Sequence, residues 1–154
     1  MIVSFCGPAD YLELDGHRET ILATLEEHVG DSFAQLFFSC RGHFDIFGLV
    51  CGKEFQKTHP LTELVGITPW FSYEFDQNES ILYMFFYDRV LDPPLDPIPY
   101  EKALARRAEW IAEQSDLVIA YVDAEHEQDF PALRCAKALG KRIVNVADTD
   151  PSNR

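Results

Sequence analysis

The sequence predicts an α/β protein: a three-layer Rossmann-like domain built on a five-stranded parallel sheet. Strand-like runs rich in β-branched and aromatic residues alternate along the chain with helical patterns. Such alternation is typical of a parallel sheet that helices cover on both faces. The length of 154 residues fits one domain, and a hydrophobic content of 47% supplies a core.

The expected elements follow one another in a regular order. The strands, each ending in turn residues, are Ile2–Cys6, Phe33–Ser39, Leu64–Thr68, Leu117–Val122 and Arg142–Val146. The helices cover residues 16–29, 43–57, 100–114 and 129–139. Gly30 and Gly140 close the first and last helix, because glycine readily adopts the left-handed conformation at a helix C-terminus. We therefore expect a single domain over residues 1–148, followed by a polar tail over 149–154.

One long segment, residues 69–99, breaks this alternation. It holds the aromatic-rich run ILYMFFY at 81–87 and five of the nine prolines, namely Pro69, Pro93, Pro94, Pro97 and Pro99. A long insertion at the carboxyl edge of a sheet is often a lid or a pocket wall. The alternative is a packed excursion with a short helix near 78–85.

The composition excludes several classes of partner. The 13 basic residues against 26 acidic residues give a net charge of −13, which repels the phosphate backbone of nucleic acids. No apolar run approaches the roughly 18 residues needed to cross a membrane, and the N-terminus has no signal-peptide pattern, so we expect a cytoplasmic protein. Four cysteines lie far apart without a CxxC pair, so we expect reduced thiols and no metal.

Candidate positions lie in the turns after the first, second and fourth expected strands, the last of which covers Asp123 to Phe130, and the candidate ligand contacts come from the first two of these turns. In an open parallel sheet, ligands bind beyond the carboxyl ends of the strands. These ends carry Cys6 and Gly7 in the run FCGPAD, and Ser39, Arg41, Gly42 and Asp45 in the run SCRGHFD. Asp45 is either a ribose-hydroxyl acceptor or general base, or a helix-start carboxylate that satisfies backbone N–H groups. No serine triad, HExxH, GxGxxG or GxxxxGK[ST] motif is present, so no cofactor is expected and Asp45 is the one catalytic candidate.

Two arginines extend this candidate site from the expected helix at 100–114. Helical periodicity places Arg107 near the middle of the apolar stripe that includes Trp110 and Ile111, with Arg106 at its margin. A guanidinium that faces a core needs a carboxylate or a ligand anion. Arg107 is therefore expected to meet either an internal acid such as Asp45 or a ligand.

Several of these segments together resemble the SLOG superfamily, in particular its small single-domain YspA/YpsA-like group. The resemblance rests on FCGPAD, on the turn ending in GHFD, on YDRVLDPPLDPIP, on ALARRAEWIAEQSDLVIAYV and on AKALGKRIVNVAD. It covers nearly the whole chain and is strongest after residue 87. It implies a bacterial origin, a strand order of 3-2-1-4-5 and a Rossmann-like pocket for nucleotides or nucleotide-derived ligands. The family is related to DprA/Smf and to the LOG phosphoribohydrolases.

The chain departs from the family at its glycine-rich turns. Relatives carry a CGHR-like turn after the first strand and GGxGGFD after the second, where this chain places Pro8, Cys40 and His43 among other substitutions. A WGGA-like turn aligns with residues 126–129, where Glu127 adds negative charge. Glycines in such turns let backbone N–H groups approach a phosphate. We therefore expect a phosphate cradle that is partly filled in.

The resulting expectation is a SLOG-like protein that binds or senses a small nucleotide- or nucleoside-derived ligand, without enzymatic activity. Two alternatives stay open. The first is a nucleotide-processing hydrolase or transferase, like a phosphoribohydrolase or deoxyribosyltransferase, that uses Asp45 as acid or base; the LOG-type PGGxGTxxE motif is absent. The second is a structural or interaction protein without ligand, a homo-oligomer formed through the aromatics of residues 70–87.

Overall fold

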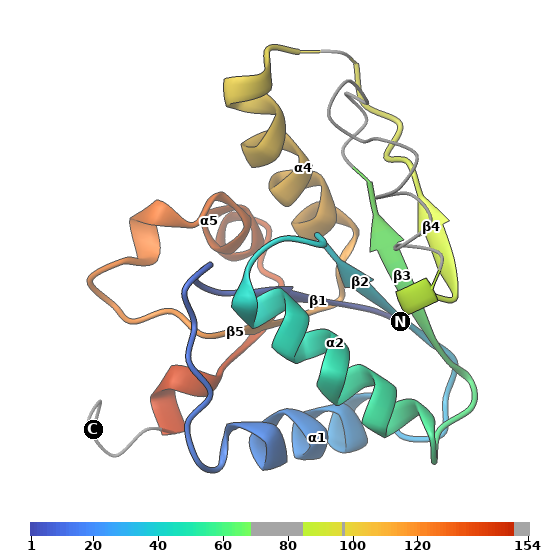
Figure 1. The fold of residues 1–154 in the computed structure, drawn as a ribbon. Helices are drawn as coiled ribbons and strands as arrows, with labels where there is room; N and C mark the ends of the chain where they lie inside the picture. The colour runs from blue at the N-terminus through green and yellow to red at the C-terminus, as the bar shows by residue number, and fades with distance from the viewer. Residues whose placement is uncertain (69–84, 97, 150–154) are drawn as a thin grey trace.

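The computed structural model describes residues 1–68, 85–96 and 98–149 (Figure 1). Most of the expected insertion, including the short helix near 78–85, lies outside the described residues, as do tail positions 150–154. Of the aromatic run proposed as an oligomer surface, Phe85, Phe86 and Tyr87 are described; Phe85 and Phe86 are exposed, whereas Tyr87 is half-buried and packs against the core. Within the described ranges, no helix is long and apolar enough to cross a membrane.

The described residues form an all-parallel sheet between two pairs of helices. The strands are β1 (Ile2–Cys6), β2 (Ala34–Phe38), β3 (Thr62–Ile67), β4 (Arg89–Leu91), β5 (Leu117–Ala120) and β6 (Arg142–Asn145). The helices are α1 (His17–His28), α2 (His43–Gln56), α4 (Tyr100–Gln114) and α5 (Pro131–Ala138), with 3₁₀ turns at Glu127–Asp129 and Val146–Thr149. The α/β class and the three-layer, Rossmann-like arrangement are thus as the sequence predicts.

The expected strand count and order need correction. Within the described residues, the sheet has six strands in the order β4-β3-β2-β1-β5-β6, not five in the order 3-2-1-4-5. The additional strand, β4, comes from the segment interpreted as an insertion and pairs with β3 at the sheet edge, with Arg89 beside Val65. The Asp88 carboxylate accepts the Leu64 N–H at 2.8 Å and so fixes the start of this short strand. The five predicted strands keep their expected neighbours once β4 is set aside.

Side chains alternate between the two faces of the sheet, as the period of a β-strand requires. Toward α1 and α2, residues such as Phe5 and Phe38 form one core, and their rings stack with centroids 5.1 Å apart. Toward α4, Phe37 and Ile67 pack against Trp110 in a separate cluster. Figure 1 shows α1 and α2 on one side of the sheet and α4 and α5 on the other. Burial on both faces explains why the strands read as nearly continuous apolar runs.

Candidate functional site

A small cleft opens at the carboxyl ends of β1 and β2, between α4 and the start of α5. Its volume is about 140 Å³, below the roughly 300 Å³ at which small-molecule pockets usually begin, so it fits a small ligand or one part of a larger one. The lining residues are Ser4, Phe5, Cys6, Gly7, Ser39, Arg41, Asp45, Ala108, Ile111, Phe130, Pro131 and Ala132. Five predicted site residues are among them: Cys6, Gly7, Ser39, Arg41 and Asp45.

Asp45 holds the turn between β2 and α2. Its side chain is buried, and its two carboxylate oxygens accept the backbone N–H groups of Ser39 at 3.0 Å and Cys40 at 2.9 Å. The Ser39 hydroxyl is a third donor, 3.3 Å from Oδ1. The sequence predicted either a ligand contact or a carboxylate that satisfies N–H groups at a helix start. The N–H groups that Asp45 binds belong to the turn before the helix.

Burial raises the pKa of Asp45 from its ordinary value of 3.8 to about 6. The hydrogen bonds from Ser39 and Cys40 and the positive charge of Arg107 act in the opposite direction, but they do not outweigh the loss of water around the carboxylate. A carboxyl group that titrates near neutral pH is unusual and marks a candidate functional position.

The first N–H groups of α2 are also bonded within the chain. His43 N–H donates to the Ala9 carbonyl at 3.0 Å, and Phe44 N–H donates to the Pro8 carbonyl at 3.4 Å. This contact requires glycine at position 7, because a Cβ there would lie 2.5 Å from the Phe44 ring. The loop after β1 therefore occupies the first two N–H groups of α2, at the kind of helix N-terminus where a phosphate often binds in other α/β proteins.

Gly42 shapes this turn without lining the cleft. Its φ angle of 86° lies in the left-handed region, and a Cβ at this position would lie 3.0 Å from the Cα of Ala9. The preceding Cys40 also has a positive φ angle, of 65°. A ligand contact of Gly42 stays a prediction, and in the fold this residue allows the turn to pass close to Ala9.

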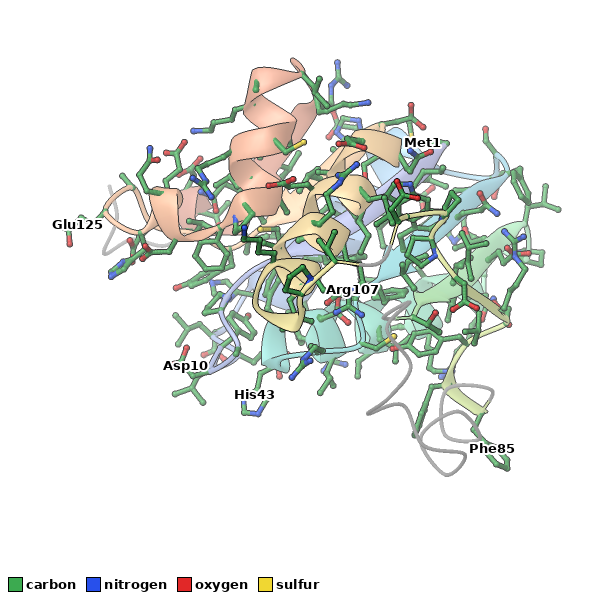
Figure 2. The ribbon with its side chains drawn as sticks, turned by 90° about the horizontal axis from the view of Figure 1, so that it is seen from above. Met1, Asp10, His43, Phe85, Arg107 and Glu125 are labelled. Atoms are coloured by element: carbon green, nitrogen blue, oxygen red, sulfur yellow. The ribbon has the colours of Figure 1, made fainter. Side chains whose placement is uncertain are left out.

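The two predicted arginines lie in different environments. Arg107 is buried, as the periodicity of α4 predicts, and its Nη1 donates to the Ile67 carbonyl at 3.2 Å. Figure 2 shows it near the middle of the molecule, whereas Asp10 and His43 lie toward the periphery. Arg106 instead pairs with Glu113 of its own helix at 3.0 Å. Among the described residues that line the cleft, Arg41 is the only arginine, and it is exposed.

Cys6 lines the cleft, and its thiol is not ionised near neutral pH. Its side chain is buried, which raises the pKa of the thiol to about 12, and a hydrogen bond with the Leu133 backbone acts in the opposite direction without outweighing burial. Cys40 follows the neighbouring strand β2 and is half-buried, so the turns after β1 and β2 meet at the cleft.

Glu127 does not line the cleft. It forms an ion pair with Lys137 of α5 and lines a separate hollow beside β6, together with Asn145. Its negative charge is therefore paired with Lys137 and lies away from the cleft. The reason is local: residues 127–129 form a 3₁₀ turn that directs this side chain along α5.

A second hollow, of about 390 Å³, lies between the ends of β1 and β5, at two of the strand ends that the sequence indicated, although none of its lining residues was predicted as a ligand contact. Strand order reverses here, and the lining includes Asp10, Tyr121, Asp123, His126 and Asp129. His126 Nδ1 lies 2.5 Å from an Asp123 oxygen, and this pairing raises the pKa of His126 and lowers that of Asp123. The spacing of an aspartate and a histidine three residues apart after a strand was the available signal.

The missed cleft residues are mainly apolar. Ile111 lies one helical turn after Arg107 on the predicted apolar stripe, and Phe130 ends the stretch that follows the fourth expected strand, which were usable signals, whereas nothing in the sequence marked Ala132. No group of three or more potential metal ligands gathers within the part of the chain that the structure describes. No protein-family model matches the sequence, and a search of curated proteins finds no match.

Proposed function

We propose that this chain is a SLOG-like binding or sensing domain. Its cleft binds a small nucleoside-like ligand without contacting a phosphate group. The observation that carries this proposal is that the backbone N–H groups around the cleft already have hydrogen-bond partners within the chain. The N–H groups of Ser39 and Cys40 are bonded to Asp45, and the first two of α2 are bonded to carbonyls of the loop after β1. A phosphate at this point would have to break one of these sets of bonds.

The chemistry of the lining fits an uncharged heterocycle with hydroxyl groups. Phe5, Ile111 and Phe130 supply apolar contact surface of the kind on which a base packs. Asp45 has three hydrogen-bond donors for the roughly four acceptor sites of a carboxylate, so one acceptor site is left for a ligand hydroxyl. The negative charge of Asp45 and the net charge of −13 both disfavour an anion.

Thermal shift followed by calorimetry tests the proposal. The probes are adenosine, guanosine, cytidine and uridine, each beside its 5′-monophosphate. A ligand at a hundredfold excess over its Kd stabilises the folded state by about 2.7 kcal/mol, so binding is readily seen. We expect at least one nucleoside to raise Tm and its monophosphate to raise it less.

A matched pair of variants on α5 locates the binding. Ala132 lines the cleft, and Ala138 is exposed on the same helix. Ala132→Met should fill the cleft and abolish the nucleoside shift, while Ala138→Met should leave it unchanged. A shift that survives Ala132→Met, or the absence of any nucleoside shift in the wild type, would contradict the proposal.

One observation favours a second function, a nucleotide-processing hydrolase or transferase. A carboxyl group with a pKa near 6 is suited to proton transfer near neutral pH. In this case, incubation with the same eight compounds would release free base, detectable by chromatography, and Asp45→Asn would abolish release. Ligand binding without any release of base would instead leave the binding function as the better account.

A further inference from the structure

The turn between β2 and α2 has the geometry of an oxyanion-binding site. Two consecutive N–H groups, from Ser39 and Cys40, each contact a different oxygen of one carboxylate, at 3.0 and 2.9 Å. The Ser39 hydroxyl adds a third donor at 3.3 Å. The positive φ angle of Cys40, 65°, belongs to the kind of backbone turn in which successive N–H groups converge on one anion.

A buried positive charge acts on the same position. Arg107 is 3% exposed, and its guanidinium lowers the pKa of Asp45, so it favours negative charge there. Its hydrogen bond to the Ile67 carbonyl keeps it in place independently of Asp45. Removing the carboxylate would therefore leave donors and positive potential converging on a small buried space.

We infer that this turn is an oxyanion site that the chain fills with its own Asp45 carboxylate, and that Asp45 thereby excludes anionic ligands from the cleft. Asp45 lines the cleft itself, so the position from which its carboxylate excludes other anions is continuous with the proposed ligand site. The second half of this inference rests on the proposed function, since it specifies that the ligand is neutral at its end nearest Asp45. The first half concerns the turn alone.

Removal of the carboxylate should create a site for a small oxyanion from solution. Asp45→Ala keeps a good helix former in the first turn of α2 and deletes only the carboxylate. Formate has the size and charge of the deleted group, and inorganic phosphate is a larger probe. Asp45→Asn is the matched control, because it fills the space with a neutral group and leaves no room for formate.

The test is the melting temperature of wild type, Asp45→Ala and Asp45→Asn in increasing sodium formate or sodium phosphate, with ionic strength held constant by sodium chloride. Asp45→Ala should melt below the wild type and regain stability saturably with formate. The expected rise is about 4 °C at tenfold excess over the apparent Kd. The wild type and Asp45→Asn should show no saturable rise.

Equal responses of all three proteins, or no response of Asp45→Ala, would overturn the inference. If Asp45→Ala does not fold in chloride, its refolding yield in formate gives the same readout, and failure to fold in both salts counts against the inference. No nucleoside enters this experiment. Rescue without nucleoside binding would therefore refute only the proposed function, and nucleoside binding without rescue would refute only this inference.

Discussion

Asp45 should make the free energy of unfolding depend on pH in the direction opposite to that of an ion-paired surface carboxylate. Its pKa is about 6 in the folded protein against an ordinary value of 3.8. The folded state therefore holds a proton that the unfolded state releases between these values. The stabilising contribution of this proton is fully present below pH 3.8 and is lost as pH rises through 6.

The size of the effect follows from these two pKa values. Linkage gives a contribution of about 1.4 kcal/mol at pH 5 and about 0.1 kcal/mol at pH 7, a difference of about 1.3 kcal/mol. Water screens this contribution little, because Asp45 is only 5% exposed. Asp45→Asn does not titrate, so its unfolding free energy lacks this component whatever its absolute stability.

Urea unfolding of the wild type and Asp45→Asn at pH 5, 6 and 7 measures the difference directly. Subtracting the two proteins at each pH cancels the other carboxylates, which they share. The stability of the wild type relative to the variant should fall by about 1.3 kcal/mol from pH 5 to pH 7. A difference in unfolding free energy that is constant, or that rises with pH, would mean that hydrogen bonds and Arg107 outweigh burial. The conclusion that burial raises the pKa of Asp45 would then be wrong.

Three further predictions concern residues around the cleft. Gly7→Ala should destabilise the fold by about 1–3 kcal/mol in urea unfolding, because its Cβ would lie 2.5 Å from the Phe44 ring; a neutral effect would mean that the ring moves freely. Arg107→Met should raise the pKa of Asp45 further, measured by NMR titration, and an unchanged pKa would show that the two groups are uncoupled. Cys6 should resist alkylation at pH 8 in the folded protein and react in urea, as followed by mass spectrometry, since burial raises its pKa to about 12; rapid alkylation of the folded protein would contradict this.

The sequence was sufficient for five strands of the sheet and their neighbours, because strands buried on both faces are nearly continuous apolar runs. It was insufficient for β4, since a three-residue strand close to Pro93 and Pro94 carries little local signal. The burial of Arg107 followed from helical periodicity alone. Such patterns report which face of an element is apolar, and the core is set by that property.

The candidate site was harder to predict because its contacts depend on turn conformation. That Asp45 binds the N–H groups of Ser39 and Cys40 depends on the left-handed φ angle of Cys40, which is a non-glycine residue. The pairing of Glu127 with Lys137 depends on the 3₁₀ turn before α5. Substitutions at the glycine positions predicted that side chains occupy this region, but they did not indicate that Asp45 would accept the Ser39 and Cys40 N–H groups.

The most direct test of the account is calorimetric comparison of a nucleoside with its 5′-monophosphate, using the nucleoside that gives the largest thermal shift. The account predicts that the wild type binds the nucleoside at least tenfold more tightly, a difference of about 1.4 kcal/mol, and that Asp45→Ala narrows or reverses this preference. Tighter binding of the monophosphate by the wild type, or the same preference in both proteins, would contradict the claim that Asp45 occupies the anion position of the cleft.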